Sequence, residues 1–391
     1  MMMYQGVSIS VTLWLLWLPW SGVWSVSAFL ITTTTSDSRP NCISTSTFTT
    51  FACSKTFDYH RRHYHLQHAT AIDYEGEVLV TRTYNNDANN NTDDELTTTN
   101  NTSSSHTIHY RIHKRMNLSS QQAAPMLVLH GGPGIPSDYL LPLRQVIPYR
   151  SIVFYDQLGC GRSPGPETQA AYSIESSLDD LELVIKHSGL QRFHLYGQSF
   201  GGILAFEYMK RIAERKNNND DDRDAPKCLS AILSSTPCDV QQVEARAGNL
   251  IAALLDEDPD ETTVMERFQA RHVCQKVVLL DDTDKNGKKK RVPPQPLTDA
   301  YQHAGTVWRG TGSIQDWAAT APSESAQRLP SCMILRGEND FVTEDCVEGW
   351  SNVFNHQFVR FKELQQLSHH GLLENGAVYG EIVDQYFSQY D

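Results

Sequence analysis

The chain has 391 residues, of which 40% are hydrophobic, and a formal net charge of −13. This length and apolar content suffice for one large α/β domain with an insertion or for two small domains. The negative charge argues against a nucleic-acid partner. The 8 cysteines are scattered and form no C-x-x-C pair, so the sequence predicts no metal site, no disulfide framework and no cofactor.

Residues 1–70 are expected to be a presequence outside the fold. Residues 11–31 are strongly apolar, and the small residues 25–27 have the spacing of a signal-peptide cleavage site before Ala28. The following Ala-Phe step, together with residues 28–70, which are rich in Ser and Thr and poor in acids, resembles a bipartite plastid presequence. We therefore expect entry into the secretory pathway and a plastid as destination. Secretion and an uncleaved membrane anchor are the alternatives. Once the presequence is removed, no stable membrane association is expected.

From residue 71 on, strands and helices alternate, which is typical of a mostly parallel sheet flanked by helices. Residues 71–237 and 311–391 are interpreted as the two parts of this core. Residues 238–310 are interpreted as a helical lid inserted between strands. Residues 85–105 are almost all Asn, Asp, Thr and Ser, which predicts a disordered insertion between two hairpin strands. Strands are expected at 77–84, 107–113, 126–129, 151–155, 193–196, 231–233, 332–335 and 357–361, and helices near 178–187, 202–209 and 376–388.

Residues 197–201 read Gly-Gln-Ser-Phe-Gly and match the pattern G-x-S-x-G. The pattern lies between the expected strand 193–196 and the apolar face of the helix at 202–209. A sharp strand-to-helix turn exposes the serine hydroxyl, so that it can attack a carbonyl carbon. Glycines are needed beside it because side chains there would clash as the strand runs into the helix. Ser199 is therefore the candidate nucleophile.

A serine hydroxyl needs a base to remove its proton, and the expected chain order is serine, acid, histidine. Asp340 follows a late strand and is the preferred acid, with Glu338 as the alternative. Two adjacent histidines follow the last strand. A serine before the first histidine and Glu374 five residues after it favour His369 over His370.

Acyl transfer also needs hydrogen-bond donors for the developing oxyanion. The backbone N–H of Phe200, directly after the candidate nucleophile, is one expected donor. The second is expected from residues 130–134, His-Gly-Gly-Pro-Gly, which follow the buried strand 126–129. Glycines allow the backbone to approach the substrate closely. Gly132 is the favoured donor in this loop, and Gly131 is the alternative.

Taken together, residues 130–134, the Asp-Tyr-Leu at 138–140 and the Phe-Tyr-Asp-Gln-Leu-Gly-Cys-Gly-Arg-Ser at 154–163 resemble the proline iminopeptidase family of serine peptidases. The resemblance is greatest to the tricorn-interacting aminopeptidase branch. It runs from about residue 72 to the C-terminus apart from the polar insertions, and it includes residues 311–317. It implies an α/β-hydrolase fold with a helical lid. It also implies Ser199 as nucleophile, Asp340 as orienting acid, His369 as general base, and Gly132 and Phe200 as oxyanion donors.

One departure from the family concerns the free amine of the substrate, which aminopeptidases of this family hold with glutamates. Phe341 stands directly after the acid, and Val307 occupies the neighbourhood of the other expected glutamate. An ammonium in a partly buried pocket needs a counter-charge. Glu338 is the candidate for this role, with Glu344 or a lid residue as alternatives, and Trp308 is assigned to substrate binding.

We therefore expect a serine hydrolase that removes N-terminal residues, proline among them, from short peptides through an acyl-enzyme. Because the expected glutamates are missing, the alternative is an esterase or amidase that acts on small uncharged acyl compounds. A non-catalytic binding protein on the same fold would have lost a member of the triad, and none is lost in this sequence.

Overall fold

The computed structural model describes residues 10–14, 30–34, 72–85, 101–114, 123–215, 225–275, 310, 312–321 and 326–391. The chain divides into two units, Met1–Gln67 and His68–Asp391. In the first unit, β1 (Ser10–Trp14) pairs antiparallel with β2 (Leu30–Thr34). The rest of the expected presequence lies outside the described residues. None of the helices in the described ranges has the length and hydropathy needed to cross a membrane.

The second unit contains an eight-stranded sheet with the strand order β10-β9-β8-β7-β5-β6-β4-β3. The pairings β3–β4 and β4–β6 are antiparallel, and all others in this sheet are parallel. The predicted mostly parallel sheet is confirmed. Its strands are β3 (Ile72–Asn85), β4 (Asn101–Lys114), β5 (Met126–Leu129), β6 (Ile152–Tyr155), β7 (Arg192–Gln198), β8 (Lys227–Ser234), β9 (Ser331–Gly337) and β10 (Val359–Leu364).

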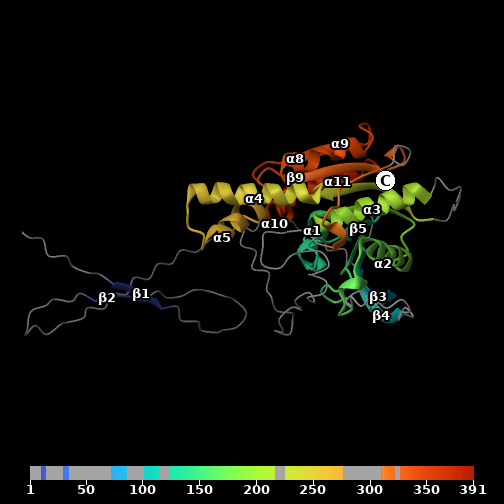
Figure 1. Ribbon diagram of the computed structural model, residues 1–391, viewed down its shortest axis with the longest axis horizontal. Helices are drawn as coiled ribbons and strands as arrows, with labels where there is room; N and C mark the ends of the chain where they lie inside the picture. Colours follow the sequence, from blue (N-terminus) through green and yellow to red (C-terminus); the bar gives the residue numbers. More distant parts are fainter. Residues whose placement is uncertain are drawn as a thin grey trace, which may run out of the picture. The chain divides into compact units, whose positions relative to one another are not determined.

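Helices cover both faces of this sheet, as the continuous apolar runs of its central strands require. On β5, Leu127 and Leu129 face one hydrophobic cluster, and Met126 and Val128 face another. The first cluster includes side chains of the helices drawn in green in Figure 1, α2 (Ile174–His187) and α3 (Phe200–Arg215). The second includes side chains of α1 (Leu143–Val146) and of α11 (Gly376–Phe387), which closes the chain. The alternation along β5 thus places the core on both sides of the sheet.

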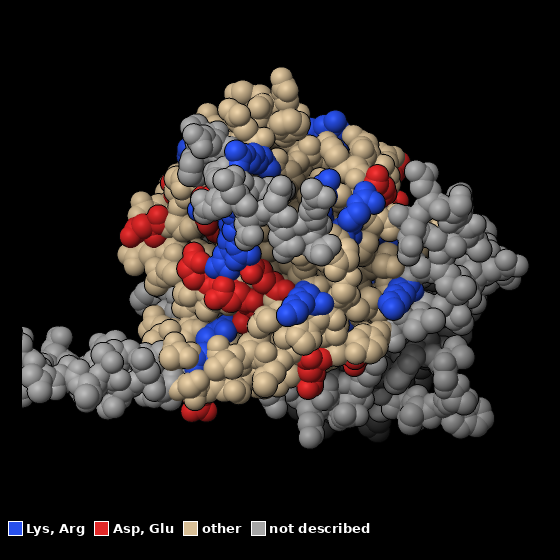
Figure 2. Space-filling model, turned by 90° about the vertical axis from the view of Figure 1, so that its right-hand side faces the viewer, with Lys and Arg blue, Asp and Glu red and all other residues tan. Residues whose placement is uncertain are grey.

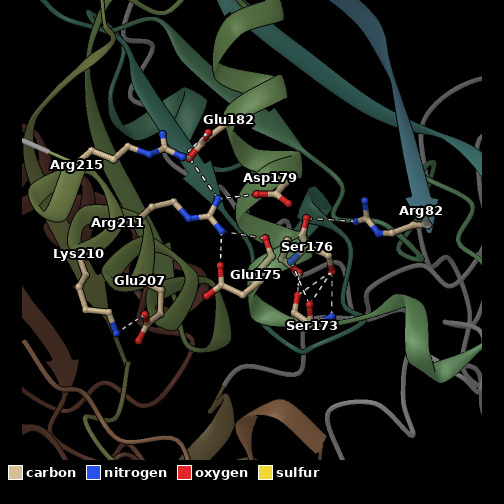
Figure 3. Close-up of polar contacts among 11 residues, drawn as sticks. Arg82, Ser173, Glu175, Ser176, Asp179, Glu182, Glu207, Lys210, Arg211 and Arg215 are labelled. Atoms are coloured by element: carbon tan, nitrogen blue, oxygen red, sulfur yellow. Dashed lines mark hydrogen bonds and ion pairs between the residues drawn. The ribbon is translucent and has the colours of Figure 1, made fainter. Parts of the chain in front are cut away.

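Helix α2 begins at a capping box. The Ser173 hydroxyl accepts a hydrogen bond from Ser176 N (3.1 Å), and Ser176 Oγ accepts one from Ser173 N (3.0 Å). Two N–H groups that the helix itself cannot satisfy are therefore paired. The Arg82 guanidinium on β3 donates a hydrogen bond to Ser176 O (3.4 Å) and so links β3 to the start of α2, as Figure 3 shows.

Ion pairs join α2 to α3 on the surface. Arg211 of α3 pairs with Glu175, with Asp179 (2.7 Å) and with Glu182 (3.3 Å) of α2, and Arg215 also reaches Glu182 (3.0 Å) (Figure 3). Single exposed pairs contribute about 0–1 kcal/mol, so this network supplements the apolar contact between the helices. On the face shown in Figure 2, a group of acidic side chains is bordered by basic ones, so neither positive nor negative charge covers a large continuous area.

The first part of residues 238–310 is helical. It consists of α4 (Val240–Glu257), α5 (Val264–Phe268) and a turn of π-helix, η5 (Gln269–Val273). Helices α4 and α5, drawn in yellow in Figure 1, pack through Ala247, Leu254, Val264 and Phe268. The chain is described again at Gly310, so most of the remaining lid, with Val307 and Trp308, lies outside the described residues.

The hairpin insertion is shorter than predicted. Strand β4 begins at Asn101, and its residues 101–105 pair with Thr81–Asn85 of β3. The prediction of disorder is therefore wrong for residues 85 and 101–105. Backbone pairing with a neighbouring strand overrides the low strand propensity of Asn and Ser.

Candidate active site

Ser199 occupies a sharp turn between β7 and α3 at the carboxyl edge of the sheet. Its φ of 54° lies in the left-handed region, which is rare for residues other than glycine and which costs about 1–3 kcal/mol. Neighbouring backbone holds this conformation, because Ser199 N donates to Ser234 O on β8 (2.8 Å) and Ser199 O accepts from Gly202 N (2.8 Å). The strained turn brings Ser199 to the wall of a pocket.

The glycines of the motif are required by the close approach of α3 to the sheet. A Cβ at Gly201 would lie 2.3 Å from Leu129 O and 2.5 Å from His130 O. A Cβ at Gly197 would lie 2.4 Å from Gly201 O. All three distances are far below a van der Waals contact, so side chains at these positions would push the helix away from β5 and β7.

Asp340 and His369 meet at the same edge of the sheet. Asp340 follows β9, His369 follows β10, and His369 Nδ1 lies 2.8 Å from Asp340 Oδ1 with both side chains buried. The same carboxylate oxygen accepts a hydrogen bond from Val342 N (2.9 Å), which fixes its orientation. Since Nδ1 is used by the acid, Nε2 is the ring nitrogen that can take a proton from a nucleophile.

The two sequence alternatives occupy different surroundings. Glu338 is exposed and accepts a hydrogen bond from Gln366 N (2.7 Å), and it is not among the residues that line the pocket. This geometry favours Asp340 as the acid and does not favour Glu338 as an amine ligand. His370 lines the pocket, but its ring packs edge-on against Tyr139 at 5.3 Å and 75°. Burial and the neighbouring His369 lower the pKa of His370 to about 3, so it stays neutral.

A pocket of about 230 Å³ opens in front of Ser199 and His369. This volume is at the small end for ligand sites and suits a small substrate. The rest of its described wall is mainly apolar and comes from α3, α4, α5, η5 and the loop after Asp340. It includes Ile203, Val243, Met265, Phe268, Val273 and Phe341.

The structure distinguishes between Gly131 and Gly132, the two candidate oxyanion donors of the glycine loop. Gly131 N donates to Tyr139 Oη (2.8 Å), so this N–H already has a partner. Gly132, whose φ is 116°, lines the pocket together with Phe200 at the start of α3. The N-terminus of a helix carries partial positive charge, which favours a developing anion there. The geometry therefore favours Gly132 over Gly131.

The described pocket wall contains no Asp or Glu. Where an acid was expected, the ring of Phe341 stacks on His369 with centroids 4.3 Å apart and an interplanar angle of 28°. Likewise, the described part of the chain contains no group of three or more His, Cys, Asp and Glu placed to hold a metal ion.

Sequence analysis missed the contacts that the lid makes with the catalytic loops. His369 N donates to His272 O (3.3 Å) and His370 N donates to Val273 O (2.9 Å), so η5 holds the backbone of both histidines. His272 Nδ1 also lies 2.8 Å from Asn339 O, beside the acid. No local pattern marks these contacts, because they join segments that are far apart in the sequence.

The buried Glu374 is a second residue whose structural role the sequence analysis did not give, although a sequence pattern included it. Its carboxylate accepts hydrogen bonds from Ser368 N (2.7 Å) and from Gln275 N (2.6 Å). It thus joins the residue before His369 to the segment that follows η5. The spacing that identified His369 included this glutamate, and the structure shows the contacts behind that spacing.

Comparison with known proteins shows the family of the chain. Residues 124–376 match the family model of the alpha/beta hydrolase fold. The match covers more than half of the chain, and the chain belongs to this family.

Within that family, the chain is similar to proteins named proline iminopeptidase. The one from Saccharolobus solfataricus is 26% identical over 284 residues, which cover 68% of this chain and 84% of the relative. The one from Thermoplasma volcanium is 28% identical over 307 residues, which cover 72% and 93%. The crystal structure of proline iminopeptidase from Mycobacterium smegmatis superposes with a TM-score of 0.57 at 22% identity, covering 73% of this chain and 95% of that one, and shows the same fold. The resemblance to proline iminopeptidases is confirmed, while the tricorn-interacting branch stays a prediction.

Proposed function

We propose that the chain is a serine aminopeptidase that releases N-terminal residues, proline among them, from short peptides. The observation that carries the proposal is the pairing of His369 with Asp340 in the same pocket as Ser199 on its strained turn. Similarity to proline iminopeptidases over most of their length supports the substrate class.

In the proposed mechanism, Ser199 Oγ attacks the carbonyl carbon of the first peptide bond while His369 Nε2 takes its proton. Asp340 holds the ring in the required tautomer and stabilises the imidazolium. The N–H groups of Gly132 and Phe200 receive the oxyanion of the tetrahedral intermediate. His369 then returns the proton to the leaving amine, and water hydrolyses the acyl-enzyme by the same steps in reverse order.

The proposal is tested by turnover of the naphthylamides of proline, alanine and leucine by the purified protein. Ser199→Ala should lower kcat/KM by about 10,000-fold or more, because the remaining groups supply binding and oxyanion stabilisation without a nucleophile. An unchanged melting temperature would show that the fold is intact. Turnover by the Ser199→Ala protein at the wild-type rate would contradict the mechanism.

One observation favours a second candidate function, an esterase or amidase for small uncharged acyl groups. The described pocket wall offers no carboxylate for an ammonium, and Phe341 makes the wall beside His369 apolar. Each naphthylamide should therefore be compared with its N-acetylated form and with a short acyl ester. An aminopeptidase prefers the free amine, whereas preference for the acetylated or ester substrates would favour the second function.

We also propose that residues 1–70 direct the chain into the secretory pathway and on to a plastid. The apolar segment, the small residues at 25–27 and the Ser/Thr-rich composition support this proposal. The test is a fusion of residues 1–70 to a fluorescent protein in cells with a secondary plastid. Fluorescence confined to the cytosol would contradict targeting, and fluorescence in the medium would indicate secretion.

A further inference from the structure

The hydroxyl of Tyr139 lies at the centre of a buried chain of hydrogen bonds. It accepts a hydrogen bond from Gly131 N (2.8 Å) and donates one to Gln198 Oε1 (2.6 Å). At the other end of the same amide, Gln198 Nε2 donates to His369 O (3.4 Å). The Tyr139 and Gln198 side chains are both buried, with 4% and 3% of their surface exposed. The chain therefore joins the glycine loop, the serine turn and the histidine loop, and Gln198 also lines the pocket.

Its two ends allow one arrangement of protons. Gly131 N–H can only donate, so the Tyr139 oxygen accepts there and its own proton points to Gln198. His369 C=O can only accept, so the amide nitrogen of Gln198 must face it. With the amide turned over, two carbonyl oxygens would face each other in a buried site, which is unfavourable. Ser235 Oγ donates to the same His369 oxygen (3.2 Å), so this carbonyl accepts two hydrogen bonds.

Each member of the chain is a neighbour of a group that the proposed mechanism uses. Gly131 precedes the oxyanion donor Gly132, Gln198 precedes Ser199, and His369 is the base. The ring of Tyr139 also packs edge-on against His370, next to that base. Burial raises the pKa of the Tyr139 hydroxyl, which favours the protonated form that donates to Gln198.

We propose that Tyr139, acting through Gln198, is a positioning residue that holds the oxyanion donor, the nucleophile and the base in register. The proposal rests on the proposed function. Neither side chain carries out chemistry. Without the hydroxyl, Gly131 N–H loses its acceptor and the glycine loop can shift, which displaces Gly132 from the place where the oxyanion forms. A displacement of a fraction of an ångström is enough to weaken such a site.

The test is Tyr139→Phe, which removes one oxygen atom and keeps the ring against His370. We expect kcat to fall about 10- to 100-fold with KM nearly unchanged, because the oxyanion interaction is made only in the transition state. Tyr155→Phe is the matched control. Tyr155 is equally buried, and its hydroxyl has no hydrogen-bond partner among the described residues. Its kcat and KM should stay within about two-fold of wild type.

A second variant distinguishes positioning from simple stability. Gln198→Met removes the amide, and the double variant Tyr139→Phe with Gln198→Met should be little slower than the worse single variant, because both interrupt one chain. Multiplicative effects on kcat, or a Tyr139→Phe protein with wild-type kcat and only a lower melting temperature, would overturn the proposal. The comparison uses whichever acyl substrate the wild-type protein turns over. A wild-type protein without any acyl-transfer activity would contradict the proposed function instead.

Discussion

Two buried histidines each pair with a carboxylate at opposite ends of the strands of the same sheet. His369 Nδ1 lies 2.8 Å from Asp340 Oδ1 at the carboxyl edge, and His194 Nε2 lies 3.0 Å from Asp391 Oδ1 near the start of β7. The two pairs are nearly alike in distance, although the Asp391 side chain is 23% exposed and that of Asp340 is fully buried. They differ in what surrounds the second ring nitrogen.

His194 is fully buried, and both of its ring nitrogens have polar neighbours. Its Nδ1 lies 2.9 Å from Ser230 Oγ, and its ring stacks on Phe387 with centroids 4.6 Å apart. Its carboxylate partner is held by Arg150 through two contacts, of 2.8 and 3.0 Å. His369 instead lines a pocket beside a serine. A histidine with a carboxylate partner thus becomes a catalytic base only where its other nitrogen meets a nucleophile and a substrate.

The largest expected effect comes from breaking the pair at the carboxyl edge. Asp340→Asn keeps an oxygen for Val342 N but cannot hold His369 in the tautomer that accepts a proton at Nε2. We expect kcat/KM to fall about 10,000-fold with little change in melting temperature. Asp391→Asn is the matched change at the other edge and should leave kcat/KM within about two-fold at 25 °C. Equal losses in the two variants would show that the comparison is wrong.

The next prediction sharpens the comparison by separating the two adjacent histidines. His369→Ala should lower kcat by about 10,000-fold because it removes the base. His370→Ala removes an edge-on contact with Tyr139 and should lower kcat by less than about 10-fold, since aromatic contacts contribute about 0.5–1.5 kcal/mol. Steady-state kinetics of both variants would show which of the two histidines is the base. A larger loss for His370→Ala would transfer the role of base to His370.

Stability should respond in the opposite order. Asp391→Asn leaves Arg150, which is 1% exposed, without its main partner. Breaking a fully buried pair costs about 3–5 kcal/mol, and the 23% exposure of Asp391 reduces our expectation to about 2 kcal/mol, or roughly 5 °C in melting temperature. Asp384→Asn is the control. Asp384 lies 3.6 Å from Arg150 with 33% exposure and should cost less than about 1 kcal/mol. If thermal unfolding showed equal shifts, Asp391 would have no special role.

The comparison also explains which features of the fold and of the site could be predicted from the sequence. Ser199 was predicted because its turn, its glycines and its flanking strand and helix are neighbours in the chain. Asp340 and His369 were accessible through chain order, because parallel strands deliver their following loops to one edge. The predicted strands and helices are present in the structure, and most of their ends differ by a few residues.

Other features depend on contacts that no local pattern carries. The choice between Gly131 and Gly132 depends on the hydroxyl of Tyr139, which takes the N–H of one of them. The support from η5 joins residues about a hundred positions apart, and Arg150 meets Asp391 across 241 positions. Glu338 was the alternative acid because of its position beside Asp340, but its exposed side chain accepts a hydrogen bond from Gln366 N and does not line the pocket. Tertiary packing decides each of these, and periodicity and motif spacing do not report it.

The smallest expected effect is the pH dependence of stability that His194 supplies. Burial lowers the pKa of His194 to about 4, below its ordinary value of 6.5, so the unfolded chain binds the proton first as the pH falls. Its contribution to stability is complete above pH 6.5 and is lost as the pH falls toward 4. The pKa of Asp391 is lowered to about 2, despite its partial burial, by hydrogen bonds from Arg150 and His194, so its contribution is lost only below about pH 4. As the pH falls from 6.5 to 5.5, the free energy of unfolding should decrease more for wild type than for His194→Gln, by less than about 1 kcal/mol. The glutamine cannot titrate but can keep a hydrogen bond to Asp391. Melting temperatures of the two proteins across this range provide the test, and parallel curves would mean that the pKa of His194 is the same in the folded and unfolded states.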